Sequence, residues 1–206
     1  LLILDEPLAG IKPQAREEAW DEIRRLRAEL GVTTLMLTSV VSEALAHAER
    51  LAVMDLGRVL QAGTPQELYN QPKDVFVARL LGPVNLLQGQ IDVDGPEFPG
   101  REVVVRAPIG RLVARANLPD LSRSTPVTIA IRPEALSLAP TSPGDANRFP
   151  ATIERIIFQG STLRVLLRGP GDWPVTALAF QNHAANLREG QGVTLSVVPE
   201  NVTLLL

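Results

Sequence analysis

From residue 86 to the C-terminus, the sequence consists of short runs in which apolar and polar residues alternate. Alternation with a period of two places one side of an extended chain against a core and the other in solvent, which is typical of β-strands. Glycine, proline, asparagine and aspartate separate the runs and leave little room for helices. The runs are "LLQGQID", "EVVVRA", "RLVARA", "VTIAIR", "ATIERIIF", "TLRVLLR", "PVTALA", "VTLSVV" and "VTLLL". Many short strands at this spacing predict a β-barrel or a β-sandwich.

One segment of this region, "LAPTSPGDANRFP", is rich in turn-forming residues. We expect it to form a loop, with the strands resuming at Ala151. The break at residues 142–147 would either divide two small barrels or interrupt a single one. No exact repeat of the sequence decides between these two arrangements.

Residues 1–82 follow a different pattern, in which strand and helix signals alternate. "LLIL" and "VTTLMLT" are apolar runs of the kind found in buried parallel strands. The helix predicted between them starts at Pro13, stops at Gly31 and carries an apolar stripe that includes Trp20. The order of strand, helix and strand predicts an α/β sheet.

Further local signals follow in the same region. "SEALAHAE" predicts a short helix, and "LAVMDLGRVLQAG" predicts two strands around a tight turn at Gly57. "TPQEL" is a capping box, in which Thr64 caps a helix that begins with Pro65 and has Glu67 three residues after the cap.

The change of pattern at "LLGPVN" predicts a domain boundary near residues 82–84. A chain of 206 residues is long enough for two small domains. The sequence therefore predicts an α/β domain in residues 1–82, followed by an all-β domain in residues 83–206.

Charge and composition exclude several classes of protein. Lys and Arg number 9 against 12 Asp and Glu in residues 1–82, and 11 against 11 in the remainder, so neither part has the basic excess of a nucleic-acid binder. The absence of cysteine excludes disulfides and thiolate metal sites. No apolar stretch approaches the roughly 18 residues of a membrane-spanning helix. We expect a soluble chain that reaches a membrane only through a partner.

Two adjacent carboxylates follow the first apolar run, in "LLILDEP". A buried strand that ends in Asp5 and Glu6 is typical of a site at the edge of a sheet. The alternative is that both carboxylates are exposed at a strand end, where they cap the turn that Pro7 begins. The motif alone leaves the two interpretations open.

The order of signals in residues 1–82, ending in "LAVMDLGRVLQAGTPQELYNQP", resembles the C-terminal half of an ABC transporter ATPase subunit. "GRVLQAGTPQELYNQP" is similar to the corresponding stretch of import subunits for small solutes. The resemblance implies that Asp5 helps to hold Mg²⁺ through its water shell and that Glu6 orients or deprotonates the attacking water. Mg²⁺ prefers oxygen ligands and keeps several waters, and phosphoryl transfer depends on a positioned water, so both roles suit a carboxylate.

The motifs that would bind the phosphates are missing. Neither G-x-x-x-x-G-K-[ST] nor the Leu-Ser-Gly-Gly-Gln signature of the family occurs in the sequence. The resemblance therefore implies the C-terminal part of a longer protein. We expect ATP and Mg²⁺ to be cofactors of that intact protein, and this chain by itself to bind neither and to be inactive as an ATPase.

Two positions depart from the family pattern. Lys12 stands where the family has an Asp that couples two ATP sites, and Ser39 stands where it has a His that contacts the terminal phosphate. A serine donates a hydrogen bond but cannot carry the charge of an imidazole. One hypothesis is a slow or degenerate ATPase; the alternative is that both residues are tolerated variations and that Glu6 still functions.

In the second region, "IAIRPEALSL" resembles a TOBE-type regulatory domain, and "VVPENVTLLL" fits its closing strands. The resemblance implies one or two oligonucleotide-binding-type (OB) barrels. From the residues alone, Pro133 ends the strand and Arg132 could pair with Glu134 across the bend.

Eight of the eleven arginines in residues 83–206 lie in or next to the predicted strands, where alternate positions share a face. They would form either a solvated face or the lining of an oxyanion pocket. They are Arg101, Arg106, Arg111, Arg115, Arg132, Arg155, Arg164 and Arg168.

The OB fold also allows a single-strand nucleic-acid binder, which would need stacking aromatics in a basic groove. The charges of this region balance, and its Phe and Trp residues serve equally well as core, so we expect no nucleic-acid partner. The aromatics are Phe98, Phe149, Phe158, Trp173 and Phe180.

Together these features predict the C-terminal part of an importer ATP-binding subunit that couples ATP hydrolysis to solute uptake, with a regulatory and dimerisation β domain. The alternative is a non-catalytic OB-fold module for ligand sensing or dimerisation, with a degenerate ATPase remnant. We expect transmembrane permease subunits as partners and a cytoplasmic location at the inner face of the membrane. Exposed apolar edges at "LLIL" or "TTLMLT" would also favour a homodimer or self-association.

Overall fold

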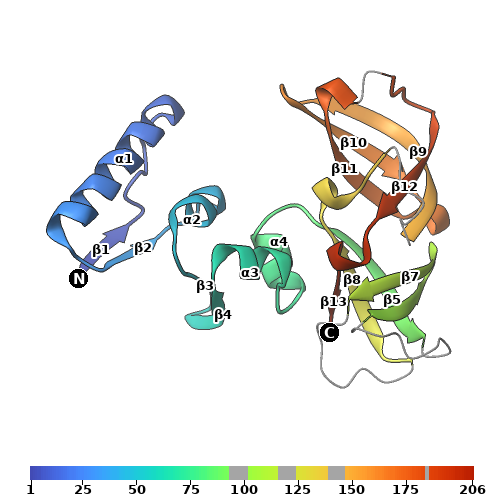
Figure 1. Cartoon of the computed structure of the whole chain (residues 1–206), viewed down its shortest axis with the longest axis horizontal. Helices are drawn as coiled ribbons and strands as arrows, with labels where there is room; N and C mark the ends of the chain where they lie inside the picture. The colour runs from blue at the N-terminus through green and yellow to red at the C-terminus, as the bar shows by residue number, and fades with distance from the viewer. Residues whose placement is uncertain (93–101, 116–123, 139–146, 184–185) are drawn as a thin grey trace.

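The computed structural model describes residues 1–92, 102–115, 124–138, 147–183 and 186–206. Figure 1 shows an N-terminal lobe that contains the helices (residues 1–81) and a β lobe (residues 85–206) that contains most of the strands. Phe98, Arg101 and most of the loop predicted in "LAPTSPGDANRFP" lie outside the described residues.

The N-terminal lobe combines two small sheets with helices. Its elements are β1 (Leu2–Asp5), α1 (Pro13–Leu30), β2 (Thr34–Leu37), α2 (Val41–His47), β3 (Leu51–Asp55), β4 (Arg58–Gly63), α3 (Pro65–Asn70) and α4 (Val75–Leu80). β1 and β2 are parallel neighbours, and β3 and β4 form an antiparallel hairpin. The predicted order of strands and helices is confirmed.

The ends of the predicted helices are set by the residues that the sequence indicated. Pro13 occupies the first turn of α1, and Gly31 ends it in a left-handed conformation with φ 59°, its N–H donating to the carbonyl of Arg27. Thr64 and Glu67 form both bonds of the capping box at α3. One helix was not predicted: α4, whose first turn is capped by the side chain of Asp74.

The expectation that the first two strands are buried is wrong. Ile3, Leu35 and Leu37 are 60%, 54% and 46% exposed. Ile3 is in register with Leu35, and Asp5 with Leu37, so the exposed residues share one face of this two-stranded sheet, and no described element covers that face. The prediction of exposed apolar surface on these strands is therefore confirmed, and Leu30 at the end of α1 adds to it at 64% exposed.

The β lobe consists of two antiparallel sheets. One sheet has the order β13-β8-β5-β6-β7 and the other has the order β11-β10-β9-β12. The strands are β5 (Asn85–Asp92), β6 (Glu102–Ala107), β7 (Gly110–Arg115), β8 (Pro126–Ile131), β9 (Asn147–Phe158), β10 (Thr162–Arg168), β11 (Pro174–Phe180), β12 (Gly192–Val197) and β13 (Val202–Leu205). Short 3-10 turns are η1 (Pro133–Ala135), η2 (Pro170–Asp172), η3 (Gln181–His183) and η4 (Pro199–Asn201).

The predicted start of one strand needs correction. β9 begins at Asn147 and not at Ala151. The turn-forming residues ahead of Ala151 suggested a loop, but Asn147 and Pro150 both have register partners in β12. A proline is compatible with a strand where its nitrogen is not required as a donor.

The two sheets are built from two copies of one topology. Strands β7-β6-β5-β8 and β11-β10-β9-β12 follow the same spatial order, and each set is followed by a Pro-Glu turn, η1 or η4. Each copy then extends into the other sheet: Thr203 of β13 pairs with Ala130 of β8, and Ser137 forms a bridge with Ser196 of β12. The β lobe is therefore formed by two halves, each of which completes the sheet of the other. The arrangement as two separate barrels, which was one of the two considered from the sequence, is not observed among the described residues.

A pair of buried asparagines joins the sheets at equivalent places. The amide of Asn85 donates to the carbonyl of Thr176 and accepts from its N–H, both at 2.8 Å. Asn147 binds Val113 in the same way, at 2.8 and 2.6 Å. Each asparagine substitutes for one strand partner and satisfies main-chain groups that would otherwise be buried without one.

The core of the β lobe lies between the two sheets and draws buried residues from both. Phe149 and Trp173 pack there with ring centroids 5.8 Å apart, and the indole N–H of Trp173 donates to the carbonyl of Leu86 at 2.9 Å. The core is continuous across the two repeats, so they form a single packed unit.

Candidate functional site

The carboxylates predicted from the sequence lie where the two parallel strands end together. Asp5 is the last residue of β1 and is in register with Leu37, the last residue of β2. The N–H of Glu6 donates to the carbonyl of Leu37 at 2.9 Å and extends the ladder by one bond. Glu6 has φ 43°, an unusual value for a residue other than glycine, and such strain is found preferentially at functional sites.

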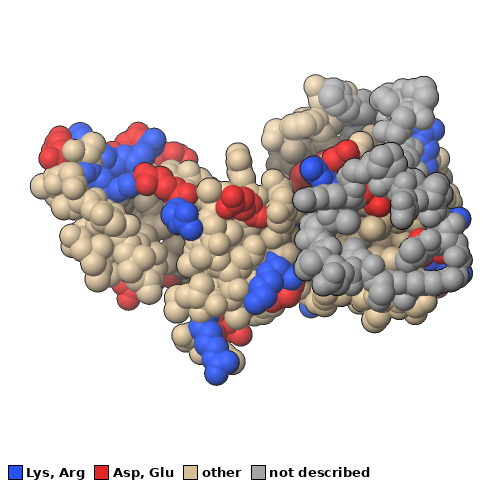
Figure 2. Space-filling model, turned by 60° about the horizontal axis from the view of Figure 1, so that its bottom comes forward, with Lys and Arg blue, Asp and Glu red and all other residues tan. Residues whose placement is uncertain are grey.

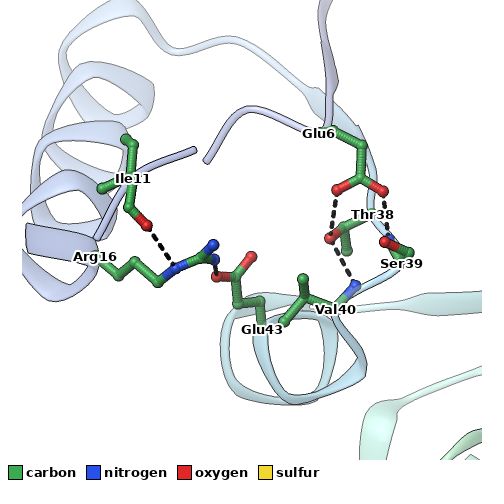
Figure 3. A network of polar contacts seen from close by, with 7 residues as sticks. All are labelled: Glu6, Ile11, Arg16, Thr38, Ser39, Val40 and Glu43. Carbon is green, nitrogen blue, oxygen red and sulfur yellow. Dashed lines mark hydrogen bonds and ion pairs between the residues drawn. The ribbon is translucent and has the colours of Figure 1, made fainter. Parts of the chain in front are cut away.

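The end of β2 holds the side chain of Glu6 in place, as Figure 3 shows. The N–H of Ser39 donates to one carboxylate oxygen at 2.6 Å, and the hydroxyl of Thr38 donates to the other at 3.3 Å. The Thr38 hydroxyl in turn accepts from the N–H of Val40 at 3.0 Å. These contacts bring together two of the predicted site residues, Glu6 and Ser39.

Hydrogen bonds from Ser39 lower the pKa of Glu6 below its ordinary value, with smaller contributions from Thr38 and from the charge of Arg16. Glu6 is therefore ionised at neutral pH. A carboxylate whose pKa is lowered is a weaker proton acceptor than an ordinary one, while its oxygens can still accept further hydrogen bonds.

The side chain of Arg16 joins the loop after β1 to α1 and α2 (Figure 3). Arg16 of α1 donates through Nε to the carbonyl of Ile11 at 3.2 Å and forms an ion pair with Glu43 of α2. Glu43 is only 8% exposed. Lys12, the other departure from the family pattern, lies at the exposed start of α1 and makes no side-chain capping bond.

Asp5 is exposed, and its carboxylate offers oxygen atoms that could coordinate a metal ion at the strand end. In the part of the chain that the structure describes, no three His, Cys, Asp or Glu side chains gather into a metal-binding cluster. One carboxylate is still compatible with Mg²⁺, because this ion takes oxygen ligands and completes its shell with waters and substrate phosphates.

A second polar site lies between the two lobes. Arg132 at the end of β8 does not pair with Glu134 as the sequence suggested. Its guanidinium instead donates to four main-chain carbonyls of the N-terminal lobe and the linker, at 2.9–3.1 Å: those of Ala78, Gly82, Pro83 and Tyr69. Carbonyls in the last turn of a helix have no intrahelical partner, so those of Tyr69 and Ala78 are available to accept from Arg132.

Tyr69, the sole tyrosine of the chain, completes this junction. Its ring lies 4.1 Å below the guanidinium carbon of Arg132, and its hydroxyl donates to Glu134. Burial and the bond to Glu134 raise the pKa of Tyr69 to about 12. A cavity of about 320 Å³ adjoins these residues and is also lined by Glu200 and Thr203. Tyr69 was not among the site residues predicted from the sequence; its position at the end of a capped helix was the available signal.

The arginines of the β lobe are largely on a solvated face. Arg106 and Arg111 both pair with Asp92, at 3.2 and 3.4 Å, and Arg168 pairs with Glu154 at 2.8 Å. Arg115, Arg155 and Arg164 are exposed. Of the two arrangements expected for the described arginines, the solvated face agrees with these contacts, with Arg132 as the exception.

The aromatic residues do not form a stacking platform among the described residues. Phe149 and Trp173 are in the core, and Phe158 and Phe180 are 65% and 64% exposed on different faces of their strands. Figure 2 shows basic and acidic side chains intermixed on the face in view. The described residues therefore do not present the basic groove with stacking aromatics that a single-strand nucleic-acid binder needs.

Among the described residues, no helix combines the length and the apolar character that crossing a membrane requires.

Comparison with known proteins defines the class to which this fold belongs. Residues 129–205 match the family model of the TOBE domain. A solved structure of the cytoplasmic molybdate-binding protein ModG, with molybdate bound, aligns with a TM-score of 0.52 and 20% identity over 58% of this chain and 94% of that protein. The likeness to ModG concerns the fold alone.

Curated relatives give the more particular identification. The chain is 37% identical over 171 residues to the sulfate/thiosulfate import ATP-binding protein CysA 2 of Chromobacterium violaceum, covering 83% of this chain and 44% of that protein. It is 34% identical to the spermidine/putrescine import ATP-binding protein PotA of Nostoc sp. (82% and 42%) and 35% identical to the Fe(3+) ions import ATP-binding protein FbpC of Streptomyces avermitilis (84% and 46%). The chain is thus similar to ATP-binding subunits of ABC importers, with a TOBE-domain match in residues 129–205, and it spans a little under half the length of these three relatives.

Proposed function

We propose that this chain is the C-terminal part of the ATP-binding subunit of an ABC importer, which in the intact protein couples ATP binding and hydrolysis to solute uptake. Residues 1–82 are the C-terminal part of a nucleotide-binding domain, and residues 83–206 are a TOBE/OB-type regulatory domain. The observation that carries the proposal is the position of Glu6, directly after Asp5 at the end of β1 and held by the end of β2. The names of the relatives support it.

In this proposal each carboxylate has one role. Asp5, at the exposed strand end, would hold Mg²⁺ through the waters of the ion, and Mg²⁺ would supply positive charge that offsets the charge of the phosphates. Glu6 is kept ionised and in one orientation by Thr38 and Ser39, so it accepts a hydrogen bond from the attacking water and aligns it.

Ser39 affects the proposed site through both its main-chain N–H and its side chain. Its N–H holds Glu6, which any residue except proline would also do, but its side chain is shorter than the histidine found there in the family. We therefore propose slow turnover in the intact protein, since a neutral hydroxyl does not offer the charge of an imidazolium to a terminal phosphate.

The partners and location follow from the same assignment. Two ATP-binding subunits would close on ATP, and transmembrane permease subunits would hold them at the cytoplasmic face of the membrane. The relatives are named for sulfate or thiosulfate, polyamines and iron, so the proposed solute is restricted to the class of small solutes.

The first experiment is to sequence the DNA upstream of the codon for Leu1. We expect a phosphate-binding motif, G-x-x-x-x-G-K-[ST], followed by Leu-Ser-Gly-Gly-Gln. The full-length protein from that gene should bind ATP, and Glu6→Gln should abolish turnover while leaving ATP binding intact. Equal turnover of the wild type and Glu6→Gln would overturn the proposed role of Glu6.

The serine hypothesis has its own test in the same full-length protein. Ser39→His should raise turnover by about tenfold or more, which corresponds to about 1.4 kcal/mol of transition-state stabilisation. Ser39→Ala keeps the N–H that holds Glu6 but loses the hydroxyl, as Ser39→His does, so it is the control for loss of that hydroxyl. If Ser39→His leaves a normal turnover unchanged, Ser39 is a tolerated variation.

A second candidate function is a non-catalytic ligand-sensing or dimerisation module. The observation in its favour is the fold shared with ModG, whose structure contains molybdate. In this case the DNA upstream of Leu1 would lack both ATP-binding motifs, and molybdate or sulfate would raise the melting temperature of the chain. The pairing of Arg106, Arg111 and Arg168 with carboxylates leaves fewer free cations for an oxyanion.

A further inference from the structure

The Arg132 side chain reaches out of the β lobe and ends in the N-terminal lobe. It starts directly after β8 and donates to the carbonyl of Tyr69 in α3, to that of Ala78 in α4, and to the linker carbonyls of Gly82 and Pro83. Four acceptors on three segments surround one guanidinium. Arginine is suited to this arrangement because its five N–H groups are fixed in one plane.

Other contacts also hold the two lobes together at this junction. The Tyr69 ring stacks on the guanidinium, and its hydroxyl binds Glu134 in the 3-10 turn that follows Arg132. Thr203 of β13 donates to the carbonyl of Asn70 at 3.2 Å. Ala78, Ala130 and Leu205 form a small buried cluster in which α4 meets β8 and β13. These contacts connect the two strands at one edge of the first sheet to the helices.

The internal repeat of the β lobe provides a comparison for Arg132. The equivalent of Arg132-Pro133-Glu134 is Val198-Pro199-Glu200, which has the same extended residue followed by the same 3-10 turn. Val198 is 39% exposed. Because a valine serves at this point of the second repeat, the turn itself does not require an arginine. The requirement for Arg132 comes from the contact with the N-terminal lobe.

We propose that Arg132, Tyr69 and Glu134 form an inter-lobe latch that fixes the orientation of the β lobe on α3 and α4, so that the two lobes move as one body. Lobes joined by a short linker would otherwise be expected to reorient. The latch does not depend on the function proposed above, because it concerns only contacts within this chain. In any longer protein that contains the chain, it would transmit a displacement of α4 to the TOBE domain.

The experiment measures the distance between the lobes directly. The chain contains no cysteine, so spin labels on Arg58→Cys in the β3–β4 hairpin and Ser161→Cys in the β9–β10 turn are unique. Both positions are exposed. We expect a single narrow distance distribution for the otherwise unchanged chain. Arg132→Met should broaden it about twofold or more, because relative motion of the lobes is then restored.

Three further variants define the result. Arg168→Met is the control, because Arg168 also donates to a main-chain carbonyl and, unlike Arg132, pairs with a carboxylate, with both partners inside one repeat. It should leave the distribution narrow. Arg132→Lys should give an intermediate width, since its compact ammonium cannot reach four acceptors, and Tyr69→Phe should broaden the distribution less than Arg132→Met does.

Two outcomes would overturn the latch. The first is an unchanged distribution in Arg132→Met whose near-ultraviolet circular dichroism shows a folded β lobe. The second is equal broadening in Arg168→Met, which would indicate general loosening. If Arg132→Met does not fold, Arg132→Lys and Tyr69→Phe decide the question, and unchanged widths in both refute the proposal.

Discussion

Asn147 offers a quantitative test of how the two sheets of the β lobe are held together. The residue is fully buried, and its amide makes both a donor and an acceptor bond to the main chain of Val113, at 2.8 and 2.6 Å. Asn147→Ala removes both bonds and leaves the N–H and the carbonyl of Val113 without a partner.

The expected cost can be worked out from these two groups. A buried main-chain group without a partner costs about 1–3 kcal/mol, and partial entry of water reduces the sum for two groups, so we expect a loss of about 2–4 kcal/mol. That is a large part of the roughly 5–15 kcal/mol by which a domain is stable. Asn85→Ala should cost a similar amount, because Asn85 makes the equivalent pair of bonds to Thr176.

The assay is urea denaturation followed by tryptophan fluorescence. The chain has two tryptophans, Trp20 in the N-terminal lobe and Trp173 in the β core, so the Trp20→Phe background reports on the β lobe alone. Trp20 suits replacement because its indole nitrogen has no hydrogen-bond partner. The exposed Asn201→Ala is the control and should change the unfolding free energy by less than about 0.5 kcal/mol. A cost for Asn147→Ala no larger than that of the control would refute the reasoning.

Three other predictions concern single groups. Ultraviolet titration of Tyr69 should give a pKa of about 12, and Glu134→Gln should lower it. Because folding raises this pKa, the stability linked to it is complete below the unfolded value of about 10 and is lost as the pH rises through 12. An unfolding free energy that does not change between these two pH values would contradict the assignment. In an NMR titration, the pKa of the Glu6 carboxyl should lie below its ordinary value, and Thr38→Val should raise that pKa part of the way back. Because folding lowers this pKa, the stability linked to it is present above the unfolded pKa and is lost as the pH falls through the folded pKa. Leu56, at φ 45° and 93% exposed, should be replaceable by Asn with a gain of about 0.5 kcal/mol in thermal unfolding, since Asn adopts this conformation at lower cost; a destabilised variant would show that the leucine makes a contact of its own.

Much of the N-terminal lobe was predictable because its signals are local. Pro13 and Gly31 bound α1, and Thr64 with Glu67 caps α3, through bonds between residues at most four positions apart. The helix α4 had the same kind of signal, an Asp74 cap before an apolar run, and was not predicted. The burial of β1 and β2 was wrong because burial depends on which elements cover a sheet, and the strand sequence does not specify its neighbours.

The candidate site divides in the same way. The sequence placed Asp5 and Glu6 at a strand end and Ser39 after the next parallel strand, and parallel strands necessarily end at the same edge. The contacts of these side chains are evident only in the tertiary structure. Glu6 accepts hydrogen bonds from Thr38 and Ser39, and Arg16 and Glu43 join the adjacent helices. The orientation of a side chain depends on rotamers and neighbours that spacing does not determine.

By itself, the sequence determined the two kinds of secondary structure, their order and the family resemblance, because strand alternation, helix caps and short motifs act over a few residues. The tertiary structure was needed to show that the β lobe is two interlocked repeats, since the repeats share little beyond an initial asparagine and a Pro-Glu turn. It also decided the partners of Arg132 and Asn85, which lie up to 63 and 91 residues away in the chain. Contacts at such separations form only when the complete fold brings the segments together, and no local pattern around either residue specifies which carbonyl it will meet.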